Sequence, residues 1–174
     1  MGGVAKGLLP APDTGEALVA RLRRHAEAIG LRCLLIGEAA AYGGLGLPML
    51  ADDPPGIGPL GGLRALLTAA DGAPVVALAC DLPYVSPQLL RRLVDEAAQA
   101  HYDAIAARRQ DRWEPLCALY AATVLPVLDV TLAAGERSFQ ALLRRLCVRE
   151  LGLDATEARQ LTDWDTPDDI TRGP

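Results

Sequence analysis

The chain has 174 residues, a net charge of −5 and a pI near 5.0, and its 17 basic residues are dispersed along it. This charge balance gives no electrostatic basis for binding a nucleic-acid backbone. No apolar run reaches the roughly 18 residues of a membrane span, and the N-terminus lacks the features of a signal peptide. We therefore expect a cytoplasmic protein with one domain, residues 1–174, and neither nucleic-acid nor membrane partners.

The composition favours an α/β fold, because the hydrophobic residues are mainly Ala, Leu and Val, with two Trp, four Tyr and one Phe. Cysteines occur at four widely separated positions: Cys33, Cys80, Cys117 and Cys147. Their spacing fits neither a zinc site nor a disulfide framework, so we expect reduced, half-buried thiols. Both histidines, His25 and His101, are expected on solvated helix faces.

The first half of the chain predicts a helix, two short strands and a second helix. Residues 15–29 carry apolar side chains at helical spacing, and Gly30 ends this predicted helix. The short apolar runs at 33–36 and 48–51 are typical of buried strands. A Pro- and Gly-rich loop at 52–59 then leads into a helix predicted for 61–70.

The second half repeats the alternation. Residues 74–80 (PVVALAC) carry the strongest strand pattern, and Ser86 caps a helix predicted to reach about residue 100. Further predicted elements are strands at 103–107, 116–122 and 147–151, a polar turn at 108–112, helices at 124–134 and 138–146, and a short terminal helix from Thr166. This order predicts a three-layer αβα, Rossmann-like fold with a mostly parallel sheet.

Asp81 is the clearest candidate for chemistry. It directly follows the predicted strand at 74–80, and in open parallel sheets ligands bind at the carboxyl ends of strands. A carboxylate at this edge can hold a divalent cation together with a substrate phosphate. An aspartate that simply turns the loop is the alternative interpretation.

Two glycine-rich segments add weaker signals. The segment 58–62 (GPLGG) opens a predicted helix, where glycines expose amide donors and allow close approach of a flat ligand. Residues 1–7 (MGGVAKG) combine a glycine pair with Lys6, but lack the spacing of a Walker loop or a dinucleotide fingerprint. Lys6 is the only lysine among the basic residues, which suggests a compact ammonium for phosphate chemistry, although chance can also leave one lysine.

Six short motifs carry a family resemblance. They are MGGVAKGLL at 1–9, DDPPGIGPLGG at 52–62, CDLP at 80–83, EPLCALY at 114–120, GER at 135–137 and DTPDD at 165–169. In this order and spacing they resemble the molybdenum cofactor guanylyltransferase family, also called molybdopterin-guanine dinucleotide synthases. The resemblance covers nearly the whole chain and implies a fold like that of nucleotide-diphospho-sugar transferases.

The resemblance also implies a site. The residues implied to face the nucleotide phosphates are Gly2, Gly3 and Lys6. Those implied to surround the guanine nucleotide are Asp52, Gly58, Pro59, Leu60, Gly61 and Gly62. The implied ligands of Mg²⁺ are Asp81 and Asp165, and Lys6 and Asp81 are the implied catalytic residues.

The implied reaction transfers GMP from GTP to the terminal phosphate of molybdopterin and releases pyrophosphate. Because the attacking phosphate is already anionic, catalysis reduces to positioning and charge neutralisation. Two alternatives stay open: a related enzyme that uses CTP, and an inactive paralogue that binds a nucleotide or a partner protein. Other proteins of molybdenum cofactor biosynthesis are the partners that the resemblance suggests.

Three departures from the family pattern stand out. Family members begin with a central β-strand and a longer glycine loop, whereas this chain opens at Met1, after both, as a start assigned too late would produce. We therefore expect strand edges without a partner and fewer phosphate-binding amides. Ala5 replaces the usual aspartate, and Asp165 stands where asparagine is common, which adds negative charge near Asp81.

Overall fold

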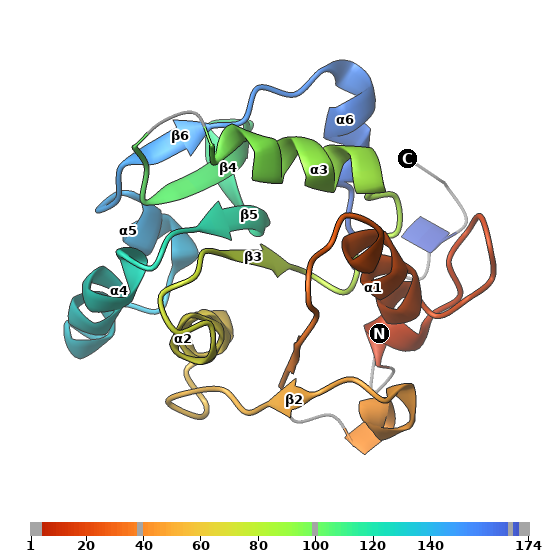
Figure 1. Ribbon diagram of the computed structural model, residues 1–174, viewed down its shortest axis with the longest axis horizontal. Coiled ribbons are helices and arrows are strands. Elements are labelled where there is room, and N and C mark those ends of the chain that lie inside the picture. The colour runs from red at the N-terminus through yellow and green to blue at the C-terminus, as the bar shows by residue number, and fades with distance from the viewer. Residues whose placement is uncertain (1–4, 38–39, 99–100, 167–168, 171–174) are drawn as a thin grey trace.

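The computed structural model describes residues 5–37, 40–98, 101–166 and 169–170. Helices cover both faces of a four-stranded sheet, which confirms the predicted α/β class (Figure 1). The strands lie in the order β3 (Val75–Leu78), β5 (Arg112–Tyr120), β4 (Ala104–Arg109) and β6 (Val148–Glu150).

The sheet is mixed, because β5 runs antiparallel to both β3 and β4 while β6 runs parallel to β4. Gln110 and Asp111 have positive φ angles, 46° and 60°, and close a two-residue hairpin between β4 and β5. The turn predicted for 108–112 is therefore shorter than expected, because Arg108 and Arg109 belong to β4 and Arg112 begins β5. Strands β3, β4 and β6 still share one direction, so their carboxyl ends lie at one edge.

Two short strands form a separate parallel pair, β1 (Leu35–Ile36) and β2 (Met49–Leu50). Within the described residues, β1 and β3 each pair with another strand on one side only.

The helices follow the predicted ranges with shifts of a few residues. On one side of the sheet lie α1 (Leu18–Ala28), α3 (Pro87–Glu96) and α6 (Ala155–Gln160), and on the other α2 (Pro59–Ala69), α4 (Val124–Ala133) and α5 (Phe139–Leu143) (Figure 1). Helix α6 and the 3₁₀ helices η1 (Lys6–Leu8) and η2 (Ala40–Leu45) were not predicted. None of the described helices is long and apolar enough to cross a membrane.

Two apolar cores explain the three layers. Alternate residues of β5 point to opposite faces: Ala118 and Tyr120 pack with α2, α4 and α5, while Cys117 and Leu119 pack with α1 and α3. Burial of both faces is what makes the strands read as continuous apolar runs in the sequence.

Helix α1 is fixed by polar contacts that the sequence did not predict. His25 is buried, with Nδ1 at 3.0 Å from the Val85 carbonyl oxygen, so its predicted place on a solvated face is wrong. Arg21 is also buried, and its Nη1 donates to the same carbonyl while Nε pairs with Asp13 at 3.0 Å. These bonds tie the loop before α1 to the segment after β3. His101 is exposed, as expected, but it does not lie on a helix, because α3 ends at Glu96.

Candidate active site

Three charged side chains from distant parts of the chain meet at the carboxyl end of β3. The Lys6 ammonium on η1 donates to Asp81 Oδ2 at 3.0 Å and to Asp165 Oδ1 at 2.7 Å. Asp81 follows β3, as the sequence predicted, and Asp165 lies in the loop after α6. One cation is thus shared by two carboxylates at the sheet edge where ligands of such folds bind.

Burial differs across this cluster. The side chains of Lys6 and Asp81 are 28% and 21% exposed, whereas that of Asp165 is 69% exposed. The hydrogen bond to Asp165 raises the pKa of Lys6 well above its ordinary value; burial opposes this shift and Asp81 adds to it. Lys6 therefore carries a full positive charge at neutral pH.

Lys6 is held in place because η1 lies directly against the end of β3. The Gly7 amide donates to the Tyr42 hydroxyl at 3.2 Å. A Cβ on Gly7 would meet the Tyr42 hydroxyl oxygen at 3.0 Å and Cys80 Cβ at 3.2 Å. Only glycine fits this approach without a shift of its neighbours.

Trp164 anchors the loop that carries Asp165. Its side chain is 1% exposed, and its backbone N–H donates to the Asp81 carbonyl oxygen at 3.0 Å. The indole lies edge-on to Tyr84, with ring centroids 6.2 Å apart, and packs in a small core with Ala11 and Leu18. Trp164 was not identified from the sequence as a site residue. A signal was present, because the chain has two tryptophans and this one directly precedes the candidate ligand Asp165.

The other predicted site residues form a second group at the start of α2. Gly61 and Gly62 are buried: a Cβ on Gly61 would lie 2.8 Å from the Pro54 carbonyl oxygen, and one on Gly62 would lie 3.3 Å from Asp52 Oδ1. These two glycines therefore let α2 pack closely against the loop at residues 52–57, whereas the sequence had predicted that they contact a ligand. Leu60 is also buried, in the core.

Asp52 remains available for a ligand, because its carboxylate has no hydrogen-bond or ion-pair partner within the described residues. Gly58 and Pro59 are exposed at the start of the helix. No hydrogen bond or ion pair among the described residues links this group to Lys6, Asp81 and Asp165, which together form the Lys6 cluster. Gly2 and Gly3 lie outside the described residues, as do Pro167 and Asp168 in the predicted terminal helix.

The family profile described as MobA-like NTP transferase domain matches residues 1–151. The chain belongs to this family. It is similar over nearly its whole length to the molybdenum cofactor guanylyltransferase of Pseudomonas putida, at 36% identity over 97% of this chain and 87% of the relative. The protein of the same name from Xanthomonas euvesicatoria is 29% identical over 98% and 86% of the two chains. Asp165 lies beyond the range that the profile matches.

Solved structures of other MobA-like and nucleotidyltransferase proteins share the fold. The crystal structure of molybdopterin-guanine dinucleotide biosynthesis protein A from Archaeoglobus fulgidus matches with a TM-score of 0.80 at 23% identity, covering 98% of this chain and 89% of that one. The 2-C-methyl-D-erythritol 4-phosphate cytidylyltransferase of Thermus thermophilus matches with 0.69 at 18% identity, covering 95% and 90%. The predicted nucleotidyltransferase-like α/β fold is confirmed.

Asp81 and Asp165 are the two residues of the Lys6 cluster that could hold a divalent cation. Asp81 and Asp165 supply carboxylate oxygens, the ligands that Mg²⁺ prefers, and both already bind a cation in Lys6. No group of three or more His, Cys, Asp or Glu side chains in the described part of the chain is arranged to hold a metal by itself. Phosphates of a nucleotide would supply the ligands that the protein does not.

Replacing Lys6 by methionine should lower the free energy of unfolding by about 1 kcal/mol, because Lys6 loses two ion pairs, one of them solvent-screened. A raised lysine pKa means that the stabilisation is fully present below the unfolded-state value of about 10.4 and is lost only as the pH rises through the folded-state value. Urea unfolding at several pH values should therefore give a constant difference from about pH 6 to pH 9. A difference that fades within this range would contradict the assignment.

Replacing Trp164 by alanine should cost about 3 to 5 kcal/mol of unfolding free energy, because it empties a fully buried site. Trp164→Phe is the matched control, since it keeps an aromatic ring in the core and should cost less: it loses part of the indole volume and the weak 3.4 Å bond from Nε1 to the Tyr84 hydroxyl. Equal stability of the two variants in urea unfolding would show that the indole does not anchor this loop.

Proposed function

We propose that the protein is a molybdenum cofactor guanylyltransferase. It transfers GMP from GTP to the terminal phosphate of molybdopterin: an acceptor phosphate oxygen forms a bond to the α-phosphorus, and the bond to pyrophosphate breaks. The observation that carries this proposal is the Lys6 ammonium held between Asp81 and Asp165 at the carboxyl end of β3, in a chain of the MobA-like family. The names of its relatives support GTP as the donor.

The residues of the cluster divide the work by charge. Lys6 stays protonated and donates to phosphate oxygens, which reduces the negative charge that develops on the leaving pyrophosphate. Asp81 and Asp165 would hold Mg²⁺, which when bound supplies further charge neutralisation and orients the phosphates. No general base is needed, because the attacking phosphate is already an anion.

Positioning in this proposal comes from Trp164 and Gly7. The bond from the Trp164 amide to the Asp81 carbonyl fixes the distance between the two carboxylate-bearing loops. Gly7 lets the lysine-bearing turn approach the end of β3. Such preorganisation lowers the barrier, since the charged groups need not rearrange during the reaction.

The departure at Asp165 is compatible with activity in this arrangement. A carboxylate in place of an amide adds one negative charge, and the 2.7 Å ion pair with Lys6 neutralises it. The unpartnered Asp52 carboxylate, beside Gly61 and Gly62, would accept hydrogen bonds from N–H groups of the guanine base, and the exposed Gly58 and Pro59 belong to the same proposed nucleotide contacts. Gly2 and Gly3 belong to the proposed phosphate contacts.

A cytoplasmic location and contacts with other proteins of molybdenum cofactor biosynthesis are part of the same proposal. All four cysteines are free thiols, which suits a reducing compartment. Cys33 and Cys80 are half-buried as expected, whereas Cys117 is buried in the core and Cys147 is exposed.

Incubation with Mg-GTP and molybdopterin should yield guanine dinucleotide and pyrophosphate in equal amounts, and CTP should compete poorly. Asp81→Asn should lower kcat/KM at least about a hundredfold, because one amide cannot replace a charged ligand at the reacting phosphates. Asp71→Asn is the matched control: Asp71 is exposed, has a φ of 47° that asparagine tolerates, and should leave the rate unchanged.

If the protein forms a cytosine dinucleotide in preference to the guanine dinucleotide, the donor is CTP and the proposed use of GTP is wrong. Binding of Mg-GTP without any pyrophosphate release, in the presence of molybdopterin, would instead favour the inactive paralogue.

A further inference from the structure

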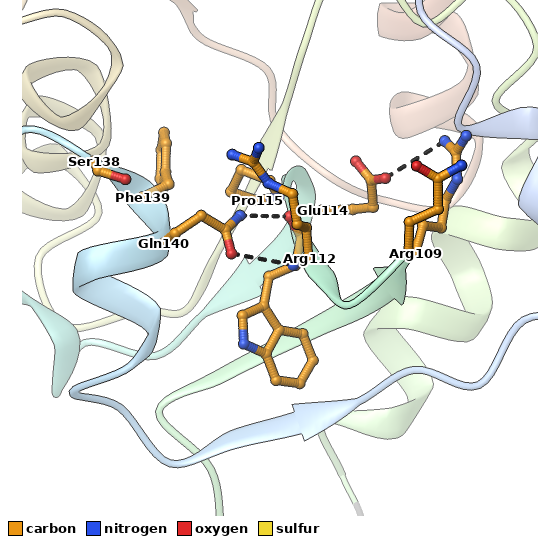
Figure 2. Close-up of a pocket in the computed structure, with 9 residues that line it drawn as sticks. Arg109, Arg112, Glu114, Pro115, Ser138, Phe139 and Gln140 are labelled. Atoms are coloured by element: carbon orange, nitrogen blue, oxygen red, sulfur yellow. Dashed lines mark hydrogen bonds and ion pairs between the residues drawn. The ribbon is translucent and has the colours of Figure 1, made fainter.

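A second polar concavity lies at the β4–β5 hairpin. It has a volume of about 350 Å³, within the range of small-molecule sites. The residues on which its chemistry depends are Arg109, Arg112, Trp113, Glu114, Phe139 and Gln140. Figure 2 shows Phe139 and Gln140 on α5 at one side, Arg109 and Glu114 at the other, and Arg112 between them.

Hydrogen bonds hold one wall of this cavity in place. The Gln140 side chain accepts from the Trp113 amide at 3.2 Å and donates to the Trp113 carbonyl at 2.8 Å (Figure 2). The Arg108 guanidinium lies over the Trp113 ring, 5.5 Å from its centroid. These bonds fix the start of β5 against α5, so this wall of the cavity is held by contacts within the protein.

Its charged groups are arranged to bind a ligand. Arg112 is exposed, and its guanidinium has no hydrogen-bond or ion-pair partner within the described residues. Glu114 is partly buried and lies 3.5 Å from Arg109, at the limit of a direct contact (Figure 2). An unpaired donor and a weakly paired acceptor thus face the same space.

The cavity is connected to the Lys6 cluster through the loop after α6. Arg109 Nη1 donates to the Leu161 carbonyl oxygen at 2.7 Å. Burial raises the pKa of Glu114 above its ordinary value; the charges of Arg109 and Arg112 oppose this shift, and the charge of Asp163 adds to it. Through Arg109 the cavity therefore contacts the start of the loop that carries Asp165.

The sheet order separates the cavity from the proposed nucleotide side. Asp52 lies just after β2, and Figure 1 shows β2 and α2 on one side of β3 and the strands β5 and β4, which the hairpin joins, on the other. Asp81 follows β3, between the two. A donor bound near Asp52 and an acceptor bound at the hairpin would meet at Asp81, Lys6 and Asp165.

We propose that this cavity binds the heterocycle of the acceptor: a flat, nitrogen-containing ring system joined to a phosphomonoester. Glu114 accepts hydrogen bonds from N–H groups of the ring, and Arg112 donates to its oxygen or nitrogen acceptors. The acceptor phosphate then extends along the loop after α6 towards Lys6. This inference rests on the proposed function, and it assigns specificity for the acceptor to residues outside the catalytic cluster.

The test measures binding of each substrate alone, with molybdopterin followed by its pterin fluorescence and Mg-GTP by calorimetry. Arg112→Ala and Glu114→Gln should each weaken molybdopterin binding at least about tenfold, because each removes a charged hydrogen-bonding partner. Both should leave Mg-GTP binding unchanged. Arg144→Ala, at an exposed arginine just after α5, is the matched control and should change neither affinity.

Unchanged molybdopterin binding in both variants would overturn the cavity assignment while leaving the proposed function intact. A parallel loss of Mg-GTP binding would also overturn it, since the cavity would then not be specific for the acceptor. If the unmodified protein binds Mg-GTP but not molybdopterin, the acceptor in the proposed function is wrong, and the assignment fails with it.

Discussion

The packing of Trp164 is the constraint on which the site depends. Lys6, Asp81 and Asp165 come from the two ends and the middle of the chain, and surface ion pairs alone contribute too little to bring such segments together. The buried indole packs against Ala11 and Leu18, and its backbone amide binds the Asp81 carbonyl. Burial of this one large side chain thus stabilises the contact between the segments, and the charged groups then lie close enough to form ion pairs.

The mixed sheet gives this site two approaches. Because β3 and β4 are separated by the antiparallel β5, the loops at their carboxyl ends lie apart, with Asp81 after one and the hairpin cavity after the other. The packing of Gly61 and Gly62 on the loop at Asp52 orders the opposite flank. A transferase needs two substrates held on either side of the reacting phosphates, and this strand order provides that separation.

The sequence predicted those parts of the fold and site that depend on local pattern. Asp81 was found because it ends an apolar strand, and Lys6 because it is the only lysine in an arginine-rich chain. Helix α6 was missed, although its capping box from Asp154 to Glu157 is a local signal. Asp165 was reached only through resemblance, because nothing near it in the sequence indicates a partner 159 residues away.

Interactions over long sequence distances account for the remaining errors. The burial of His25 depends on the Val85 carbonyl, and the need for Gly61 depends on the path of residues 53–57. The reversed direction of β5 follows from a two-residue turn of Gln110 and Asp111, which has no glycine and therefore lacks the usual hairpin signature. Each of these features is fixed by tertiary packing, which local sequence patterns do not encode.

In the proposed mechanism, Lys6, Asp81 and Asp165 together form the site for nucleotide phosphates and a divalent cation. Calorimetric titration of GTP in the presence and absence of Mg²⁺ tests it most directly. Two carboxylates repel phosphate unless a cation neutralises them, so GTP should bind at least about tenfold more tightly with Mg²⁺ than without it. Equal affinity under both conditions would contradict this assignment, because the carboxylates would then not lie at the phosphates.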